Sequence, residues 1–276
     1  MIRVKLIGGL GNQLFQYACA RSLAIESKSE LVLDLSGFEK YKLREPMIKK
    51  FPLCDSISFN EKLNRTKYLD RKDKLLGRFY QERGLGFNNK LLKAKKNITI
   101  SGFFQSEQYF RKYEDIIKQE LYPSSLKAEM IRDQLAQVPI VAVHFRRGDY
   151  LEKTNFGVCD LSYYKLAIEF LRTKHVETKF LAFTDDRDWF LTKSGLADEV
   201  ELAPNDDLSD FDEFCLMSSC DHFITANSSF SWWAAWLGRN SNKIVISPKP
   251  WFDSEMLDTT SIVPSTWIEI PKSGMI

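Results

Sequence analysis

Short apolar runs alternate with amphipathic segments along most of this 276-residue chain. An apolar run of about four to eight residues bounded by turn residues predicts a buried strand, whereas apolar positions recurring about every 3.6 residues predict a helix. Strands are expected at residues 2–7, 31–35, 97–102, 140–144, 179–183, 199–202, 222–225 and 243–247. Helices are expected at residues 12–27, 126–138, 160–174 and 209–218, with two more running through Trp189 and through Trp232 to Gly238.

The regular alternation of strand and helix predicts an α/β fold with parallel, right-handed, doubly wound sheets. We place a domain boundary near Pro139, just after the expected helix at 126–138. The predicted domains are residues 1–135 and residues 136–276, with a C-terminal tail that could pack back on the first domain. Trp232, Trp233 and Trp236 have helical spacing, which indicates core packing.

The segment 39–96 breaks this pattern, because it is polar and strongly basic. Between residues 61 and 96 there are twelve Lys or Arg residues against four Asp or Glu residues. Such a segment usually forms a solvated face. The alternative is attraction to anionic lipid or to a phosphate-bearing acceptor.

Composition excludes several classes of protein. Hydrophobic residues make up 44% and charged residues 28% of the chain, as in ordinary soluble globular proteins. The net charge of +2 does not favour a nucleic-acid-binding protein. No apolar run approaches the roughly 20 residues of a transmembrane helix, and the N-terminus lacks a signal-peptide pattern. Five cysteines without a C-x-x-C pair indicate reduced thiols in a cytoplasm, and three histidines are too few for a histidine metal site.

The segment IVAVHFRRGDY at residues 140–150 predicts a buried strand that stops at two arginines and an aspartate. Strands of α/β sheets deliver polar groups at their carboxyl ends to the rim where ligands bind. Two adjacent guanidinium groups need an anionic partner, and Asp149 balances only part of their charge. Phosphate suits arginine, because the planar guanidinium donates two parallel hydrogen bonds. The alternative is an internal Arg–Asp cluster that only ties down a loop.

Polar side chains follow three of the expected strands. The three sets are His144, Arg146, Arg147 and Asp149; Thr184, Asp185 and Asp186; and Asn227, Ser228 and Ser229. Parallel strands end on one rim, so these sets are expected to share a crevice. The two serines can hold a phosphate at the start of the Trp-rich helix, or cap that helix, or do both. An aspartate can accept hydrogen bonds from guanine, which we favour over a divalent metal site, because arginine can neutralise a diphosphate without metal.

A glycine loop, Gly8-Gly9-Leu10-Gly11, separates the first expected strand from the first helix, for which Asn12 is the candidate N-cap. Glycines at this place let a ligand approach the backbone, and a helix N-terminus favours an anion. With Asp34 at the end of the next strand, the unit is similar to a dinucleotide-binding one. However, Leu14 stands where the third glycine of G-x-G-x-x-G belongs, so a tight turn without a ligand competes with this interpretation.

The sequence reads GGLGNQLFQYA at residues 8–18, VHFRRGDY at 143–150, FTDD at 183–186 and NSSFSWWAAWLG at 227–238. In this order the four segments resemble the bacterial α-1,2-fucosyltransferases, glycosyltransferase family 11. The resemblance implies a GT-B-like α/β fold with two Rossmann-like domains and a cleft between them. It implies an acceptor-side domain followed by a nucleotide-sugar-binding domain.

The same resemblance implies an inverting transfer of L-fucose from GDP-β-L-fucose to the 2-hydroxyl of a terminal galactose, in a glycan such as O-antigen or another surface polysaccharide. The acceptor is expected to be a galactose-terminated oligosaccharide or a lipid-linked glycan, chosen by residues 39–96. We expect no required metal or other cofactor and no nucleic-acid partner. We expect a cytoplasmic protein, with peripheral contact to the inner face of the membrane as an open alternative.

Carried over by motif, the resemblance implies that Arg146 contacts the β-phosphate of the donor. It implies that His144 and one acid of the second motif, Asp185 or Asp186, face guanine. The remaining donor-site residues that it implies are Arg147, Asn227, Ser228, Ser229 and Phe230.

In the first domain Gly9 and Gly11 are predicted donor-binding residues, and the resemblance implies that Asn12 of the same loop reaches across the cleft as a catalytic residue, alongside Arg146. Asp149 is the candidate general base, and an ion pair with Arg147 is the competing structural role that we favour.

Two other functions remain as alternatives. A nicotinamide-dependent oxidoreductase would use Gly9, Gly11 and Asp34. A non-enzymatic phosphate- or RNA-binding protein would use the basic residues between 62 and 96, and its affinity would fall steeply with salt.

Overall fold

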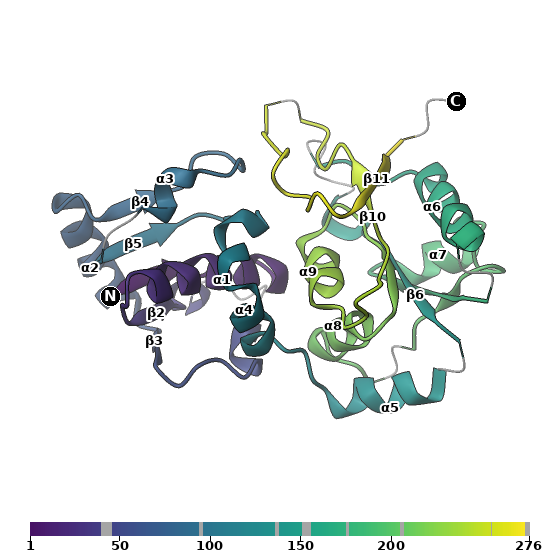
Figure 1. Cartoon of the computed structure of the whole chain (residues 1–276), viewed down its shortest axis with the longest axis horizontal. Coiled ribbons are helices and arrows are strands. Elements are labelled where there is room, and N and C mark those ends of the chain that lie inside the picture. The colour runs from purple at the N-terminus through teal and green to yellow at the C-terminus, as the bar shows by residue number, and fades with distance from the viewer. Residues whose placement is uncertain are drawn as a thin grey trace. The chain divides into compact units, whose positions relative to one another are not determined.

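The computed structural model describes residues 1–39, 46–93, 96–135, 138–150, 156–174, 177–204, 207–254 and 256–273. The chain forms two compact units (Figure 1). The first comprises Met1–Tyr122 with Thr260–Pro264, and the second comprises Pro123–Thr259 with Ser265–Ile276. Among the described residues, no helix combines the length and the apolar character that crossing a bilayer requires.

The first unit contains a parallel five-stranded sheet in the order β3-β2-β1-β5-β4. Its strands are β1 (Ile2–Lys5), β2 (Leu31–Asp34), β3 (Ile57–Asn60), β4 (Phe79–Gln81) and β5 (Ile98–Ser101). Its α-helices are α1 (Leu10–Glu26), α2 (Leu63–Leu75), α3 (Asn89–Leu92) and α4 (Glu114–Glu120). Short 3-10 helices are η1 (Ser36–Glu39), η2 (Met47–Lys50), η3 (Glu107–Tyr109) and η4 (Arg111–Tyr113).

Helix α1 is buried along most of its length, which agrees with the broad apolar face in its sequence. Its start differs from the prediction, because Gly9 occupies the N-cap position and no side chain caps the helix. Asn12 therefore lies inside the first turn and is not the N-cap. Gly8 has a φ of +82°, and a Cβ there would lie 2.7 Å from Asn12 Nδ2, so the turn requires glycine.

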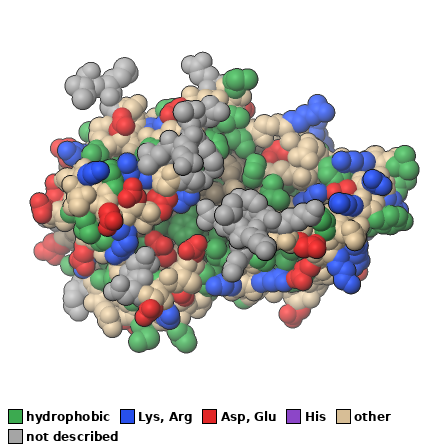
Figure 2. All heavy atoms as spheres, turned by 180° about the vertical axis from the view of Figure 1, so that it is seen from behind, with side chains coloured by type: hydrophobic (Ala, Val, Ile, Leu, Met, Phe, Trp, Pro, Cys, Tyr) green, Lys and Arg blue, Asp and Glu red, His purple; other side chains and the backbone are tan. Residues whose placement is uncertain are grey.

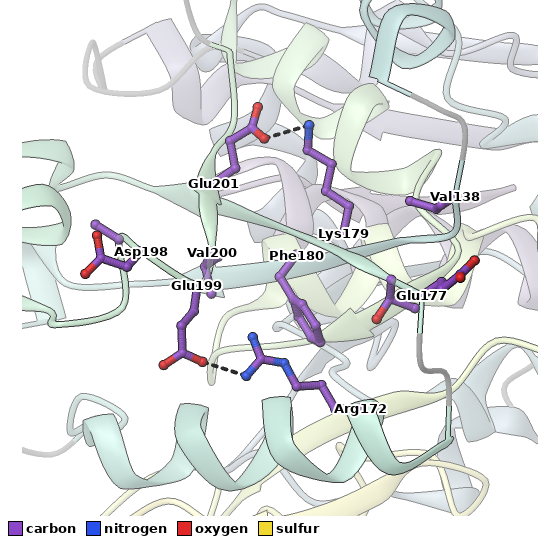
Figure 3. Close-up of a pocket in the computed structure, with 11 residues that line it drawn as sticks. Val138, Arg172, Glu177, Lys179, Phe180, Asp198, Glu199, Val200 and Glu201 are labelled. Carbon is purple, nitrogen blue, oxygen red and sulfur yellow. Dashed lines mark hydrogen bonds and ion pairs between the residues drawn. The ribbon is translucent and has the colours of Figure 1, made fainter.

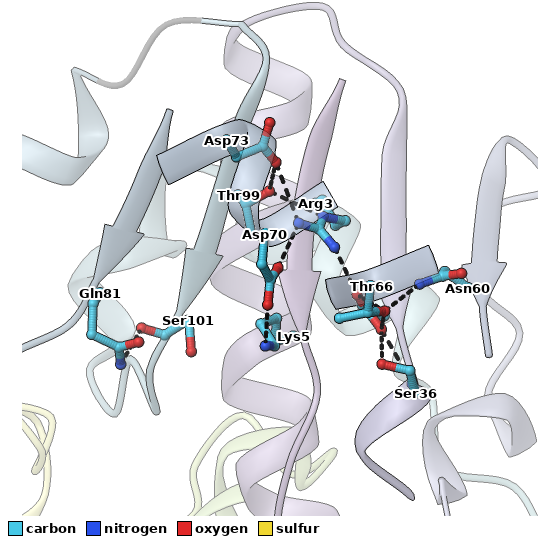
Figure 4. A network of polar contacts seen from close by, with 11 residues as sticks. Arg3, Lys5, Ser36, Asn60, Thr66, Asp70, Asp73, Gln81, Thr99 and Ser101 are labelled. Carbon is cyan, nitrogen blue, oxygen red and sulfur yellow. Dashed lines mark hydrogen bonds and ion pairs between the residues drawn. The ribbon is translucent and has the colours of Figure 1, made fainter. Parts of the chain in front are cut away.

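A buried arginine organises the other face of the first sheet (Figure 4). Arg3 on β1 is 0% exposed and pairs through Nη1 with Asp34 on β2, at 3.0 Å. Through Nη2 it pairs with two acids of α2, Asp70 at 2.7 Å and Asp73 at 3.3 Å. The network ties α2 to the sheet, because a buried charge is tolerated only when it is paired.

Asp34 is fully engaged in this network. Besides Arg3, it accepts hydrogen bonds from the hydroxyl groups of Ser36 and Thr66. Because Asp34 is buried and bound, it is not placed to receive a ribose hydroxyl, and the dinucleotide-binding alternative loses its acidic residue.

The second unit contains a parallel six-stranded sheet in the order β11-β10-β9-β6-β7-β8. Its strands are β6 (Ile140–Phe145), β7 (Lys179–Thr184), β8 (Glu201–Leu202), β9 (His222–Ile224), β10 (Val245–Lys249) and β11 (Ile268–Pro271). Its helices are α5 (Leu126–Leu135), η5 (Gly148–Tyr150), α6 (Leu161–Lys174), α7 (Arg187–Lys193), α8 (Asp210–Ser218) and α9 (Ser229–Leu237). In Figure 1, α8 and α9 lie on one side of this sheet and α6 and α7 on the other. The predicted α/β alternation is confirmed.

Three strands of the structure were not predicted from the sequence, and all three are edge strands. They are β3 and β4 at the two edges of the first sheet and β11 at one edge of the second. Most of their positions are exposed or half-buried, so the sequence shows no continuous apolar run there. The central strand β6, by contrast, is buried at every position.

The tryptophans of α9 belong to the core of the second unit, as predicted. Trp232 and Trp233 are fully buried, and Trp232 stacks on Trp236 with ring centroids 6.2 Å apart. Trp267, which precedes β11, packs against the same cluster.

Helix α5 belongs to the second unit, whereas the expected domain boundary after residue 135 would place it in the first. Two polar contacts account for the difference. Ser125 Oγ, just before α5, bonds to Asp212 of α8, and Arg132 pairs with Asp221 at 2.8 Å.

The strand order of the second sheet reverses between β6 and β9. From this point β6, β7 and β8 follow one another in one direction, and β9, β10 and β11 in the other. Ligands of open α/β sheets bind outside the carboxyl ends of the strands at such a switch point. The loops that follow β6 and β9 therefore define where a site is expected.

Candidate active site

Two arginines follow β6, and each has a carboxylate partner from the end of the neighbouring strand β7. Arg146 Nη1 lies 2.7 Å from Asp185 Oδ2, and Arg147 Nε lies 3.3 Å from Asp186 Oδ2. Asp185 Oδ1 also accepts a hydrogen bond from the backbone N–H of Arg147, at 2.9 Å. The two arginines therefore form the internal Arg–Asp cluster that was the alternative to a phosphate site. Its carboxylates are Asp185 and Asp186.

The two arginines differ in their surroundings. The Arg147 guanidinium stacks on the Trp189 ring, 3.7 Å from its centroid, and its ion-pair partner Asp186 also caps α7 through Trp189 N. This combination gives Arg147 a structural role. Arg146 Nη1 pairs with Asp185 Oδ2, and its guanidinium lies 5.5 Å from the Tyr150 ring centroid. The planar guanidinium donates parallel hydrogen bonds in a geometry that phosphate oxygens accept.

Asp149 lies in η5, between these arginines and Tyr150. Its side chain is outside the part of the chain that the structure describes. Both its predicted role as general base and its predicted pairing with Arg147 stay predictions.

His144, near the end of β6, is 6% exposed. Burial, reinforced by the charge of Arg146, lowers the pKa of His144 to about 3, so the imidazole is neutral at physiological pH. Nδ1 has no hydrogen-bond partner within the described residues. The ring lies 6.0 Å from that of Phe230, centroid to centroid. A neutral, partnerless imidazole beside an aromatic ring suits an uncharged ligand such as a nucleobase.

The loop after β9 contains two neighbours with different roles. Ser228 caps α9, because its side chain accepts a hydrogen bond from Phe230 N at 3.3 Å. Asn227 is completely buried and its side-chain amide donates to the carbonyls of Phe156 and Gly157, both at 2.9 Å. Asn227 therefore clamps the loop at 156–157, and we do not retain it as a donor contact.

Contacts between the loops join the strand ends at one edge of the sheet. Tyr150 OH donates to the carbonyl of Asn227 at 3.2 Å, and the same Tyr150 ring lies beneath Arg146. The ring contact between His144 and Phe230 makes a second link between β6 and the start of α9. The structure thus brings His144, Arg146, Asp185 and Ser228 to neighbouring positions at the switch point.

Sequence reasoning missed one acid of this region, Glu213 on α8. Burial is the main cause that raises the pKa of Glu213 to about 7, and the negative charges of Asp210 and Asp185 add to it. Glu213 is half-buried, and within the described ranges its carboxylate has no hydrogen-bond or ion-pair partner. Its neighbour Phe214 packs edge-on against Phe230, with centroids 5.2 Å apart.

The position of Glu213 follows from how α8 begins. Ser209 and Asp212 form a reciprocal capping box that fixes the first turn of the helix. The sequence contains only a weak signal for Glu213, because this acid lies between Phe211 and Phe214 but shares the first turn of α8 with Asp210 and Asp212. A carboxylate on that side of a helix is costly to bury without a partner.

In the first unit, the glycine loop follows β1, next to the loop that follows β5. Asn12 Oδ1 accepts a hydrogen bond from Gln105 Nε2 at 2.8 Å, so these two loops are joined. A Cβ at Gly9 would meet nothing within 4 Å, which leaves the backbone approachable there. Gly11 is buried within the first turn of α1.

A separate hollow of about 510 Å³ lies at the opposite end of the second sheet (Figure 3). Its walls carry two ion pairs, Arg172–Glu199 and Lys179–Glu201. Lys179 and Glu201 are the first residues of β7 and β8, so the hollow lies at the amino ends of the strands. The predicted donor-site residues are not among those that line it.

Comparison with known proteins relates the whole chain to glycosyltransferases. The family model described as "Glycosyl transferase family 11" matches residues 1–271. An alpha-1,2-colitosyltransferase of Escherichia coli is 30% identical over 298 residues, covering 99% of both chains. The O-antigen biosynthesis glycosyltransferase WbnK of Escherichia coli is 28% identical and covers 96% of this chain and 99% of its own. Human galactoside alpha-(1,2)-fucosyltransferase 1 is 24% identical over 51% of this chain and 43% of its own.

Solved structures confirm the predicted GT-B-like fold with two Rossmann-like units. The heptosyltransferase II of Escherichia coli superposes with a TM-score of 0.52 at 10% identity, over 98% of this chain and 89% of its own. The fucosyltransferase NodZ from Bradyrhizobium superposes with a TM-score of 0.50 at 17% identity, over 84% and 91%. At these identities the likeness concerns the fold alone. Since the family model spans nearly the entire sequence, the chain belongs to glycosyltransferase family 11.

Proposed function

We propose that the protein is an inverting α-1,2-fucosyltransferase, which moves L-fucose from GDP-β-L-fucose to the 2-hydroxyl of a terminal galactose. The family and the α-1,2 linkage in the names of two relatives support this assignment. The O-antigen role in the name of WbnK supports a surface glycan as acceptor, either an oligosaccharide or a lipid-linked form made in the cytoplasm. The observation that carries the proposal is the position of Arg146 at the switch point, where it pairs with Asp185 and is linked through Tyr150 to the loop that contains Ser228.

The diphosphate of the donor would lie between Arg146 and the start of α9. Arg146 offers a fork of N–H donors, and Ser228 and Ser229 lie where backbone N–H groups at a helix start face an anion. Negative charge grows on the diphosphate as the bond between fucose C1 and its oxygen breaks. Preorganised donors at that place stabilise the charge in the transition state.

The guanine base would lie against Phe230, between His144 and Glu213. Guanine N1–H and its amino group are both donors, and an ionised carboxylate accepts both. Glu213 suits this role better than either aspartate, because both oxygens of Asp185 and of Asp186 already accept a hydrogen bond or face an arginine. The neutral imidazole of His144 adds a group that can donate to or accept from the base.

The galactose 2-hydroxyl would attack fucose C1 from the face opposite the departing GDP, which inverts the anomeric carbon. Its proton must leave the hydroxyl oxygen as the new C–O bond forms. Asp149 stays the candidate to accept it, because it follows the donor-site arginines by a few residues.

We propose further that transfer needs no divalent metal. The two aspartates that could bind one are each committed to an arginine, which balances their charge. Arg146 would then neutralise the diphosphate in place of a cation.

A second donor has support from one relative. The alpha-1,2-colitosyltransferase covers nearly all of this chain, and colitose is a fucose that lacks the 3-hydroxyl group. GDP-colitose is therefore the alternative donor for the same linkage.

One assay tests both candidate donors, GDP-fucose and GDP-colitose. The purified protein is incubated with GDP-fucose, GDP-colitose or GDP-mannose and with lactose or other β-galactosides, and the product linkage is read by NMR. We expect an α-1,2-linked fucosyl galactoside. Product from GDP-colitose alone would replace the donor while keeping the reaction class, and no product from any GDP-sugar across a broad acceptor set would refute the proposal.

A further inference from the structure

The two acids of α2 both lie on its buried side. Asp70 contacts Arg3 at 2.7 Å and Lys5 at 2.7 Å, and Asp73 contacts Arg3 and Thr99 (Figure 4). These acids neutralise the cations of β1 and do not face solvent-exposed cations of α2. The arrangement leaves the outer side of α2 without an acid to balance its own positive charges.

The outer side of α2 and the turn that follows it carry only basic charges. The exposed cations are Lys62, Arg65, Lys67, Arg71, Lys72, Lys74 and Arg78. Between residues 62 and 78, all of which the structure describes, the acids are Asp70 and Asp73 of the buried network. No ion pair is recorded for any of these cations, and Lys74 alone has a recorded ring contact, with Phe79. Figure 2 shows Lys and Arg side chains gathered on the first unit, on the right, beside hydrophobic ones.

Large apolar side chains project among these cations. Leu75 is 88% exposed, Tyr68 is 67% exposed and Leu76 is 48% exposed. Tyr68 and Leu75 lie two turns apart on the same side of the helix, since an α-helix repeats about every 3.6 residues. Arg71 and Lys72 lie between them. The face thus combines an apolar strip with flanking positive charge, in full contact with solvent.

This combination fits the surface of a lipid bilayer. An interfacial helix places Leu and aromatic side chains at the boundary between headgroups and acyl chains, while Lys and Arg contact anionic headgroups. Tyrosine is enriched at that depth, because its ring is apolar and its hydroxyl is polar. The phosphate groups of a nucleic acid would pair with the cations but would leave Leu75 and Leu76 exposed to water.

We propose that the outer face of α2, formed by Tyr68, Leu75 and Leu76 with the surrounding cations, binds the surface of membranes that contain anionic lipids. The inference is independent of the donor sugar and of the galactose acceptor. It would bring the enzyme to acceptors that are anchored in the same membrane.

The test is flotation of the full-length protein with vesicles of phosphatidylcholine alone or mixed with phosphatidylglycerol. We expect binding to the mixed vesicles only, weakened by salt because exposed charges are screened. Arg71→Glu with Lys72→Glu should weaken binding at least tenfold. Leu75→Ser with Leu76→Ser should do the same while leaving the charge unchanged.

The matched control reverses two exposed cations of the second unit, Lys165→Glu with Lys193→Glu, and should bind like the wild type. Thermal unfolding of each variant checks that the fold is intact. A Leu75→Trp variant reports insertion directly, through quenching by brominated lipids above the wild-type background.

Equal binding by the serine variant and the wild type would overturn the inference. Equal loss of binding in the control variant, or quenching no greater than the background, would also overturn it. Tight binding to RNA by the wild type, lost in the glutamate variant and kept in the serine variant, would assign the face to nucleic acid instead. Absence of binding to either kind of vesicle would also contradict it, whatever the transferase assay shows.

Discussion

Arg146 Nη1 lies 2.7 Å from Asp185 Oδ2, and the other oxygen of Asp185 accepts the backbone N–H of Arg147. One carboxylate at the end of β7 therefore orients a side chain and a backbone segment at the end of β6. These residues are adjacent in space because β6 and β7 pair along their whole length, from Ile140 with Lys179 to Phe145 with Thr184. The donor site that we propose depends on this pairing.

Replacing Arg146 tests the proposed role on the diphosphate. Arg146→Ala should lower kcat by about 10² to 10³, because a preorganised partner of the developing charge is lost. Arg146→Lys should recover only part of the rate, since an ammonium lacks the planar fork. Arg172→Ala, which breaks an exposed ion pair at the amino end of the sheet, is the control and should leave the rate near wild type. Normal turnover by Arg146→Ala would remove this residue from the mechanism.

Nucleotide discrimination tests the proposed role of Glu213. The wild type should bind GDP about ten to a hundred times more tightly than inosine diphosphate, which lacks the amino group that a carboxylate would accept. Glu213→Gln should bind GDP more weakly and should discriminate between the two nucleotides by no more than about threefold. Calorimetric titration of both proteins measures this. An unchanged GDP preference in the variant would show that another group reads the base.

The pH dependence of GDP binding tests the same residue differently. Burial and neighbouring acids raise the pKa of Glu213 to about 7 in the free protein, and guanine favours the ionised form. Affinity should therefore be full above about pH 7.5 and should fall by up to about tenfold for each pH unit below about pH 7. Glu213→Gln should give a flat profile, since the pKa of His144, at about 3, keeps that ring neutral throughout. A wild-type profile that is flat between about pH 5.5 and 8 would contradict the assignment.

Chelation tests the proposal that arginine takes the place of a metal. Because Asp185 and Asp186 already face Arg146 and Arg147, EDTA should leave most of the transferase rate intact. The rate is measured before and after dialysis against the chelator. Complete loss, restored by Mg²⁺ or Mn²⁺, would mean that the aspartates exchange their arginine partners for a cation.

The buried arginine of the first unit can be tested through stability. Arg3→Ala should lower the free energy of unfolding by about 3–5 kcal/mol, because Asp34 and two half-buried acids of α2 would lose their cation. Lys49→Ala, which removes an exposed ion pair, should cost less than about 1 kcal/mol. Urea denaturation measures both, and a cost for Arg3→Ala as small as that of the control would show that the network adds little.

The sequence predicted the central strands and the edge strand β8 but missed the other three edge strands. Strands β1, β2, β6, β7 and β9 are apolar runs because they are buried, and a run of buried residues is visible without any partner. The edge strands β3, β4 and β11 have too few buried positions to show the same pattern. Their place depends on the backbone of the neighbouring strand, which supplies the hydrogen bonds.

The polar residues at the strand ends were also identifiable from the sequence, because their chemistry and their position after an apolar run are local properties. His144, Arg146, Asp185 and Ser228 all lie where that reasoning expected them, at the carboxyl edge of the second sheet. Their roles were not local properties. Asn227 belongs to the same loop as Ser228, yet its side-chain amide donates hydrogen bonds to the carbonyls of residues 156–157.

By itself the sequence determined the alternation of strands and helices, the buried central strands and the chemical groups available at their ends. Only the tertiary structure decided which group faces which: Asp185 with Arg146, Asp34 and two acids of α2 with Arg3, and Glu213 left without a partner among the described residues. The physical reason is that the hydrophobic pattern and the turn propensities are local properties of the chain. The pairing of charges depends instead on which strands and helices lie side by side.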